Sequence, residues 1–108
     1  MEKHEKIAEL NDALRKERKG GRIVETQSIR ALSDDVRQQI YAAIQSFDDF
    51  SPDNDPYQEH DFAALSVAGH RINWKIDYYD PSMTFLSDDP SDPSITQRVM
   101  TIMLAEEY

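Results

Sequence analysis

Residues 62–79 read FAALSVAGHRINWKIDYY and carry the clearest strand pattern in the chain. Apolar and polar side chains alternate along residues 71–78, which is typical of a β-strand with one buried face. We expect the strand to bury Ile72, Trp74, Ile76 and Tyr78 and to expose Arg71, Asn73, Lys75 and Asp77. Because Ala68-Gly69-His70 supplies a turn, residues 62–67 form a second strand, and the whole stretch is predicted to be a hairpin.

Two amphipathic helices are expected before the hairpin. Apolar side chains at helical spacing predict a helix over residues 3–18, which two consecutive glycines end. A second apolar face predicts a helix over residues 33–47, where Ser33 is a suitable N-cap. Between the helices, weak alternation over residues 22–29 suggests a short strand.

The segment 95–105 carries conflicting signals. Its Met, Leu and Ala residues favour a helix, whereas its β-branched residues favour a strand. We predict a strand over 97–104 after one helical turn, with a helix as the alternative. Residues 1–108 then form one α+β domain, in which a small three-stranded antiparallel sheet carries two helices on one face.

The charge of the chain is acidic and unevenly distributed. The net charge is −9, and residues 23–108 alone hold sixteen Asp and Glu against five Lys and Arg. Much of the excess lies in two proline-containing loops, residues 48–61 and 80–94, neither of which has a Lys or Arg. Contact with phosphates needs Lys and Arg, so direct nucleic-acid binding is disfavoured, and a basic protein is the natural partner.

Other features limit the class of protein. The chain has no cysteine, and so neither a disulfide framework nor thiolate chemistry is available. The N-terminal residues are charged, without an apolar stretch of signal-peptide length, and no apolar run reaches membrane-spanning length. We therefore expect a cytoplasmic protein without membrane association and without a cofactor.

Four motifs stand out from the residue pattern. They are Asn11-Asp12 with Leu14-Arg15, the block NDPY with EHDF at residues 54–62, the run WKIDYYD at 74–80, and RVMTIMLAEEY at 98–108. Together they resemble a family of small bacterial proteins described only as a domain of unknown function. The resemblance implies a bacterial source, often a plasmid or another mobile element, and it implies no activity. Ala63 departs from the glycine of the family pattern but keeps a small side chain.

The first acidic loop has three open interpretations. Residues 48–61 hold six carboxylates and one imidazole, and like charges at this density repel unless something compensates them. One interpretation is a solvated loop whose Asp and Asn side chains cap turns. A second is a protein-contact loop. The third is a Ca²⁺ or Mg²⁺ site, although the spacing is not that of an EF-hand; its candidate ligands are Asp53, Asp55, Glu59, His60 and Asp61.

Single side chains also have structural as well as functional interpretations. His60 is expected to be a structural residue bonded to a loop carbonyl, and an acid–base role beside Glu59 and Asp61 is the alternative. Tyr78 is expected in the core rather than in a base-stacking platform. Lys75 is expected to pair with an acidic residue of a neighbouring strand. A basic cluster near the end of the first helix is expected to complement the helix dipole: Arg15, Lys16, Arg18, Lys19 and Arg22.

Three functions stay open on these grounds. The first is a non-catalytic acidic interaction protein from a mobile element, whose loops mimic phosphate and inhibit a nucleic-acid-handling defence protein. The second is a divalent-metal-dependent enzyme that uses the cluster at 53–61 with Asp77. The third is a homodimeric structural or regulatory subunit that pairs through Met100, Ile102 and Leu104. Partner contacts expected for the first function are Asp48, Asp49, Asp53, Asp55, Glu59, Asp61, Asp88, Asp89 and Asp92.

Overall fold

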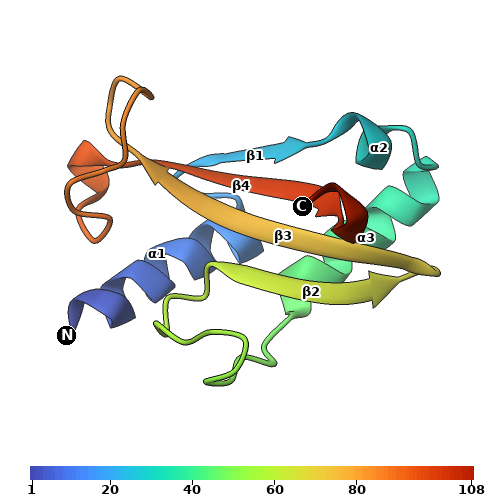
Figure 1. The fold of residues 1–108 in the computed structure, drawn as a ribbon, viewed down its shortest axis with the longest axis horizontal. Helices are drawn as coiled ribbons and strands as arrows, with labels where there is room; N and C mark the ends of the chain where they lie inside the picture. The colour runs from blue at the N-terminus through green and yellow to red at the C-terminus, as the bar shows by residue number, and fades with distance from the viewer.

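The computed structural model describes all residues from 1 to 108 and confirms an α+β fold (Figure 1). The helices are α1 (Lys3–Glu17), α2 (Gln27–Arg30) and α3 (Asp34–Ser46). The strands are β1 (Arg22–Glu25), β2 (Phe62–Val67), β3 (His70–Tyr79) and β4 (Gln97–Leu104). Two 3₁₀ turns, η1 (Pro93–Ile95) and η2 (Ala105–Glu107), flank the last strand. None of the helices combines the length and the apolar character that crossing a membrane requires.

The molecule has two layers, a sheet and a layer of helices packed on one of its faces (Figure 1). α1 and α3 lie behind the sheet in this view and contact each other. A single cluster of buried side chains joins the layers, with Leu14 from α1, Ile40 and Ile44 from α3, and Trp74 and Ile102 from the sheet. The apolar stripes of the helices and the inward side of the hairpin therefore meet in one core.

β2 and β3 form a hairpin around the two-residue turn Ala68-Gly69. Both turn residues have a positive φ, 50° and 83°, which is the geometry of a type I′ turn and suits the twist of paired strands. Ile72, Trp74 and Ile76 are buried on the side that faces the helices, as the alternation predicts. The apolar side of the hairpin thus supplies the sheet's share of the core.

The outer face of the sheet is partly covered by the segment that follows β4. The predicted exposure of Asn73 is wrong, because Asn73 and its neighbour Met103 on β4 are both buried and η2 contacts β3. Lys75 on this face pairs with Asp77 of its own strand, at 2.6 Å between Nζ and Oδ2, and not with a neighbouring strand as predicted. Only part of the outer face is therefore open to solvent.

The sheet has a fourth strand, which the predicted three-stranded antiparallel sheet lacks. The strand order is β1-β4-β3-β2, and β1 runs parallel to β4, so the sheet is mixed. Gly21 makes this pairing possible, because the backbone passes so close to the carbonyl of Arg98 that a side chain would collide with it. β1 ends at Glu25, short of the predicted residue 29, because Thr26 caps α2 by accepting the N–H of Ile29.

β4 is an inner strand. It follows one 3₁₀ turn, in agreement with the preferred of the two conformations predicted for residues 95–105. β1 pairs with one side of β4 and β3 with the other, and Met100 and Ile102 are almost completely buried. The predicted dimer contact through Met100, Ile102 and Leu104 is therefore wrong, because an inner strand has no free edge.

Gly21→Ala should destabilise the protein by more than about 2 kcal/mol, because the added methyl group would collide with the carbonyl of Arg98 and press on Leu14. The midpoint of urea unfolding, followed by the fluorescence of Trp74, measures the loss. Gly20→Ala is the matched control: its methyl group would have no neighbour, and its positive φ alone should cost about 1 kcal/mol. Equal losses in the two variants would contradict a steric role for Gly21.

Candidate functional site

Both acidic loops lie at the end of the molecule where α1 begins (Figure 1). Asn11 of α1, which is completely buried, makes three hydrogen bonds, one of which holds the first loop there. Its Nδ2 donates to the carbonyl of Glu59 (2.9 Å) and to the hydroxyl oxygen of Tyr78 (2.8 Å). Its Oδ1 accepts from Nε of Arg98 at 2.6 Å. One side chain thus joins α1, the first acidic loop, β3 and β4.

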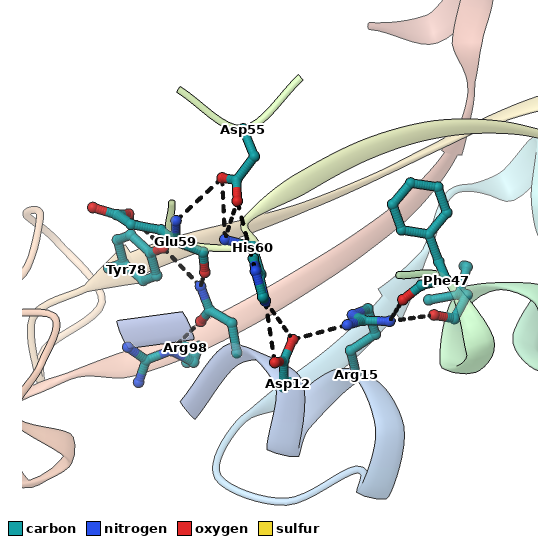
Figure 2. Close-up of polar contacts among 10 residues, drawn as sticks. Asp12, Arg15, Phe47, Asp55, Glu59, His60, Tyr78 and Arg98 are labelled. Atoms are coloured by element: carbon teal, nitrogen blue, oxygen red, sulfur yellow. Dashed lines mark hydrogen bonds and ion pairs between the residues drawn. The ribbon is translucent and has the colours of Figure 1, made fainter. Parts of the chain in front are cut away.

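Arg98 extends this contact to the second acidic loop. Its Nη2 donates to the carbonyl of Pro90, and its guanidinium lies over the ring of Tyr78, 5.1 Å from the centroid. Arg98 is 2% exposed, and this burial lowers its pKa, while Tyr78 and Glu59 act in the opposite direction. Figure 2 shows Arg98, Tyr78 and Glu59 side by side. Both acidic loops are therefore tied to one point of the fold.

His60 fastens the first acidic loop to α1 at a second point (Figure 2). Its Nδ1 lies 3.1 Å from each carboxylate oxygen of Asp12, and its Nε2 lies 3.8 Å from Oδ2 of Asp55. The imidazole also stacks on Phe50, with 4.0 Å between the ring centroids and 6° between the planes. The predicted bond to a loop carbonyl is wrong, because the partners are carboxylates and an aromatic ring. We call Asp12, His60 and Asp55 the histidine clasp.

Asp55 serves the backbone of its own loop. The residue is only 4% exposed, and its Oδ1 accepts the N–H groups of Glu59 (3.1 Å) and His60 (3.2 Å). These bonds shape the chain just before β2, where His60 has a positive φ of 56°. The carboxylate of Asp55, expected as a partner contact, is therefore turned inward and not presented at the surface.

The sequence suggested that Arg15 belongs to a basic cluster on the surface. In the structure Arg15 is buried. Its Nη1 donates to the carbonyls of Ile44 (2.8 Å) and Phe47 (2.7 Å), and its Nη2 donates to Asp12 at 2.8 Å. The two carbonyls lie at the C-terminal end of α3, where backbone acceptors lack helical partners. Arg15 therefore joins α1 to α3 and also orients the carboxylate that binds His60.

Comparison with known protein families identifies one family whose model matches the chain. The family model described as Protein of unknown function (DUF3768) matches residues 25–107, which is more than half of the chain. The chain belongs to the DUF3768 family. This confirms the resemblance to a domain of unknown function. Comparison with curated proteins and with solved structures found no match.

The family match contains His60, Arg98 and both acidic loops of this DUF3768 protein, but it begins after α1. Asn11, Asp12 and Arg15, which bind the matched region, lie outside it. The motif Asn11-Asp12 with Leu14-Arg15 is a separate observation from the sequence. The hydrogen bonds of Asn11, Asp12 and Arg15 show that this motif holds α1 against the rest of the fold.

A groove of about 850 Å³ runs between α1 and the first acidic loop of the DUF3768 protein, and Asp12, Phe50 and His60 are among its lining residues. A histidine bonded to a carboxylate is a common arrangement for a general base. Here Nδ1 faces Asp12 and Nε2 faces Asp55, so both ring nitrogens are directed at side chains of the protein itself. The geometry fits a clasp that holds the loop better than it fits a proton-transferring site.

The five candidate metal ligands are not gathered into a metal centre. No group of three or more carboxylate or imidazole side chains in the chain is arranged to hold a metal ion. Asp55 binds the loop backbone, Glu59 accepts the hydroxyl of Tyr78 at 2.9 Å, and His60 binds Asp12. Asp61 is partly buried, and this burial is the main reason why its pKa is raised. The negative charge of Glu59 raises the pKa further.

The remaining expected contact residues fall into two groups. Asp89 and Asp92 are half-buried, and each accepts the N–H and the hydroxyl of a serine two residues further along. Asp89 also lies 3.6 Å from Nζ of Lys3. The other group is exposed to solvent, and its carboxylates have no hydrogen bond or ion pair within the chain: Asp48, Asp49, Asp53 and Asp88.

The second acidic loop also presents three large apolar side chains, for which the sequence predicted no role. Met83, Phe85 and Leu86 are 42%, 71% and 74% exposed, and we call them the apolar tip. The loop is ordered by Asp80, whose Oδ1 accepts the N–H groups of Thr84 (3.0 Å) and Phe85 (3.2 Å). Two adjacent apolar residues inside an acidic, proline-flanked loop are the signal that could have identified the tip.

Asn11→Ala should destabilise the protein by about 2–4 kcal/mol, because it leaves Nε of the buried Arg98 and the carbonyl of Glu59 without a partner. Urea unfolding measures the loss, and hydrogen exchange should accelerate in residues 48–61. The matched control is Gln39→Ala, which removes an exposed hydrogen bond to Asp35 and should change stability by less than about 0.5 kcal/mol. A small loss in Asn11→Ala would show that the contact is dispensable.

Asp61→Asn should stabilise the protein at pH 7, by about 1 kcal/mol or less. The folded state raises the pKa of Asp61, so ionisation of this carboxyl disfavours folding, and protonation relieves the cost. The advantage of the variant should therefore shrink as the pH falls through the pKa of Asp61, where the wild-type carboxyl is protonated as well. Urea unfolding of both proteins from pH 7 to pH 3 tests this, and an advantage independent of pH would contradict it.

Proposed function

We propose that this DUF3768 protein is a non-catalytic interaction protein, which binds a basic partner through the end of the molecule that carries both acidic loops. The observation that carries the proposal is the set of exposed carboxylates without internal partners, on loops that buried side chains hold in place. Like charges that are kept together and left unpaired weaken the folded state. A cationic partner surface would remove this cost on binding.

The apolar tip is a second reason to expect that a partner binds at the end that carries both acidic loops. Phe85 and Leu86 are exposed on the second acidic loop, between Asp80 and Asp88. Aromatic and apolar anchors surrounded by polar residues are typical of the energetically dominant centres of protein interfaces. The tip would provide affinity by burial of apolar area, and the carboxylates around it would provide orientation and faster association.

The partner class that fits best is a nucleic-acid-handling protein. Such proteins bind phosphates with Arg and Lys, and carboxylates on ordered loops can take the place of phosphates in charge-assisted hydrogen bonds. The resemblance to proteins of plasmids and other mobile elements supports an inhibitor of a host defence protein. The protein would then compete with nucleic acid for a basic groove and would need no catalytic residues of its own.

The test compares two variants that carry the same net charge. Replacement of Asp48, Asp53 and Asp88 by Asn removes exposed carboxylates of the two loops, and replacement of Asp34, Asp35 and Glu106 by Asn or Gln removes three from elsewhere on the surface. Both variants have a net charge of −6, three less negative than −9. Tagged wild-type protein first captures partners from a nuclease-treated bacterial lysate, and each captured protein is then purified and assayed for duplex DNA binding.

The wild-type protein should displace labelled duplex DNA from the purified partner, and it should do so less well as salt rises. The loop variant should be at least about tenfold weaker, because it lacks carboxylates that face the basic groove. The control variant should differ from wild type by less than about twofold. Equal weakening of the two variants would show a general charge effect, and a partner that does not bind nucleic acid would exclude the decoy mechanism.

A further inference from the structure

β2 is an edge strand with free backbone groups. It pairs with β3 on one side only, at the end of the strand order. In antiparallel pairs, successive residues turn their N–H and C=O groups alternately toward the partner and away from it. The two-residue turn makes Val67 and His70 a hydrogen-bonded pair, and the bond from the N–H of Ile76 to the carbonyl of Asp61 (2.8 Å) follows the same alternation. Phe62, Ala64 and Ser66 therefore turn their backbone groups outward.

The outward backbone groups of β2 have no partner in the chain. No hydrogen bond from a turn, a loop or a side chain reaches residues 62–67. The strand contains no charged residue and no proline, which are the usual means by which proteins protect a sheet edge. β1 at the opposite edge differs, since it has four residues, carries Arg22 and Glu25, and runs into α2. Of the two edges, β2 is the longer and the less protected against strand addition.

We propose that β2 pairs in antiparallel register with β2 of a second copy of this chain, centred on Ala64, so that the two four-stranded sheets form one continuous sheet. This inference rests on the sheet edge alone and is independent of the proposed function of the acidic loops. A strand identical to β2 is a suitable occupant, because a twofold axis lets each copy offer the same outward N–H and C=O groups that the other needs. The charges at the two ends of the hairpin favour this occupant over an unrelated strand.

On the face of the sheet that packs on the helices, the joined hairpins bring an acidic end toward an end that carries an imidazole. The centred register places Asp61 opposite Val67 of the second copy, and Val67 is paired with His70 within each copy. Asp61 and His70 lie on the same face but two strands apart, with Val67 of the second copy between them, so the two groups are about 10 Å apart across the joined sheet, twice by symmetry. Asp61 has no cation beside it within one copy, and its pKa is raised by burial and by Glu59.

The outer face of the sheet is complementary as well. The same register places Phe62 opposite Ser66 of the second copy, and Ser66 is paired with the exposed Arg71. Arg71 makes no ion pair within the chain, and a guanidinium next to an aromatic ring is a favourable contact. Because Asp61 and Phe62 lie at one end of β2, and His70 and Arg71 lie next to the other end, antiparallel pairing of two copies joins unlike ends.

Concentration-dependent hydrogen exchange and sedimentation test the pairing on the wild-type chain. At physiological ionic strength the net charge of each copy is screened beyond about 8 Å. Sedimentation under this condition should show a monomer–dimer equilibrium with a dissociation constant below about 1 mM. The outward amides of Phe62, Ala64 and Ser66 should exchange quickly in the monomer, and their exchange rates should fall as the dimer forms. The inward amides of Ala63, Leu65 and Val67 should stay protected throughout. A monomer up to about 1 mM, or a dimer without this alternation, overturns the proposal.

A pair of substitutions at residue 64 provides the matched control. Ala64→Pro removes an outward N–H and leaves the bonds to β3 intact, so self-association should weaken by at least about tenfold. Ala64→Ser keeps the N–H and a small side chain, and it should associate as wild type does. Unchanged association of Ala64→Pro overturns the proposal. The fluorescence of buried Trp74 checks that each variant is folded. If Ala64→Pro does not fold, the exchange pattern of the wild-type chain decides whether β2 pairs with β2 of a second copy.

Discussion

The structure depends on one buried polar contact, in which Asn11 of α1 accepts a hydrogen bond from Arg98 of β4 at 2.6 Å. Removal of a guanidinium from water is costly, and only nearly complete hydrogen bonding offsets the cost. Asn11 and the carbonyl of Pro90 supply the acceptors, and the ring of Tyr78 covers one face of the cation. Since the amide of Asn11 also binds the carbonyl of Glu59, the position of α1, the order of the sheet and the placement of both acidic loops are coupled.

The acidic loops illustrate how a fold tolerates like charges at high density. Part of the negative charge is used internally, because Asp55 binds backbone N–H groups of the first loop, and Asp89 and Asp92 bind N–H and hydroxyl groups of the second. Hydrogen bonds to an ionised carboxylate are stronger than those between neutral groups, so these residues stabilise the loops that hold them. The rest of the charge is exposed and unpaired. The same segment is therefore ordered by some of its carboxylates and made available for binding by others.

The sequence allowed the hairpin and the two long helices to be predicted, because their apolar side chains recur with the period of the local structure. It did not show that β1 joins the sheet, since this depends on the close approach of Gly21 to the backbone of residue 98. The roles of Asn11 and Arg15 were missed for a related reason. Their partners lie 87 and about 30 residues away, and local patterns carry no signal for such contacts. For the acidic segments, composition located the loops but did not distinguish buried Asp55 from exposed Asp53.

The separation of 87 residues between Asn11 and Arg98 also has a consequence during synthesis. A ribosome adds about 5–20 residues per second, so roughly 4–17 s pass between the appearance of the two residues. During this time α1 has no buried partner from β4, and β1 lacks the strand with which it pairs. A helix of 15 residues is marginal in water on its own. The N-terminal part of the chain must therefore wait in an open state, and the native fold is reached only after β4 has left the ribosome.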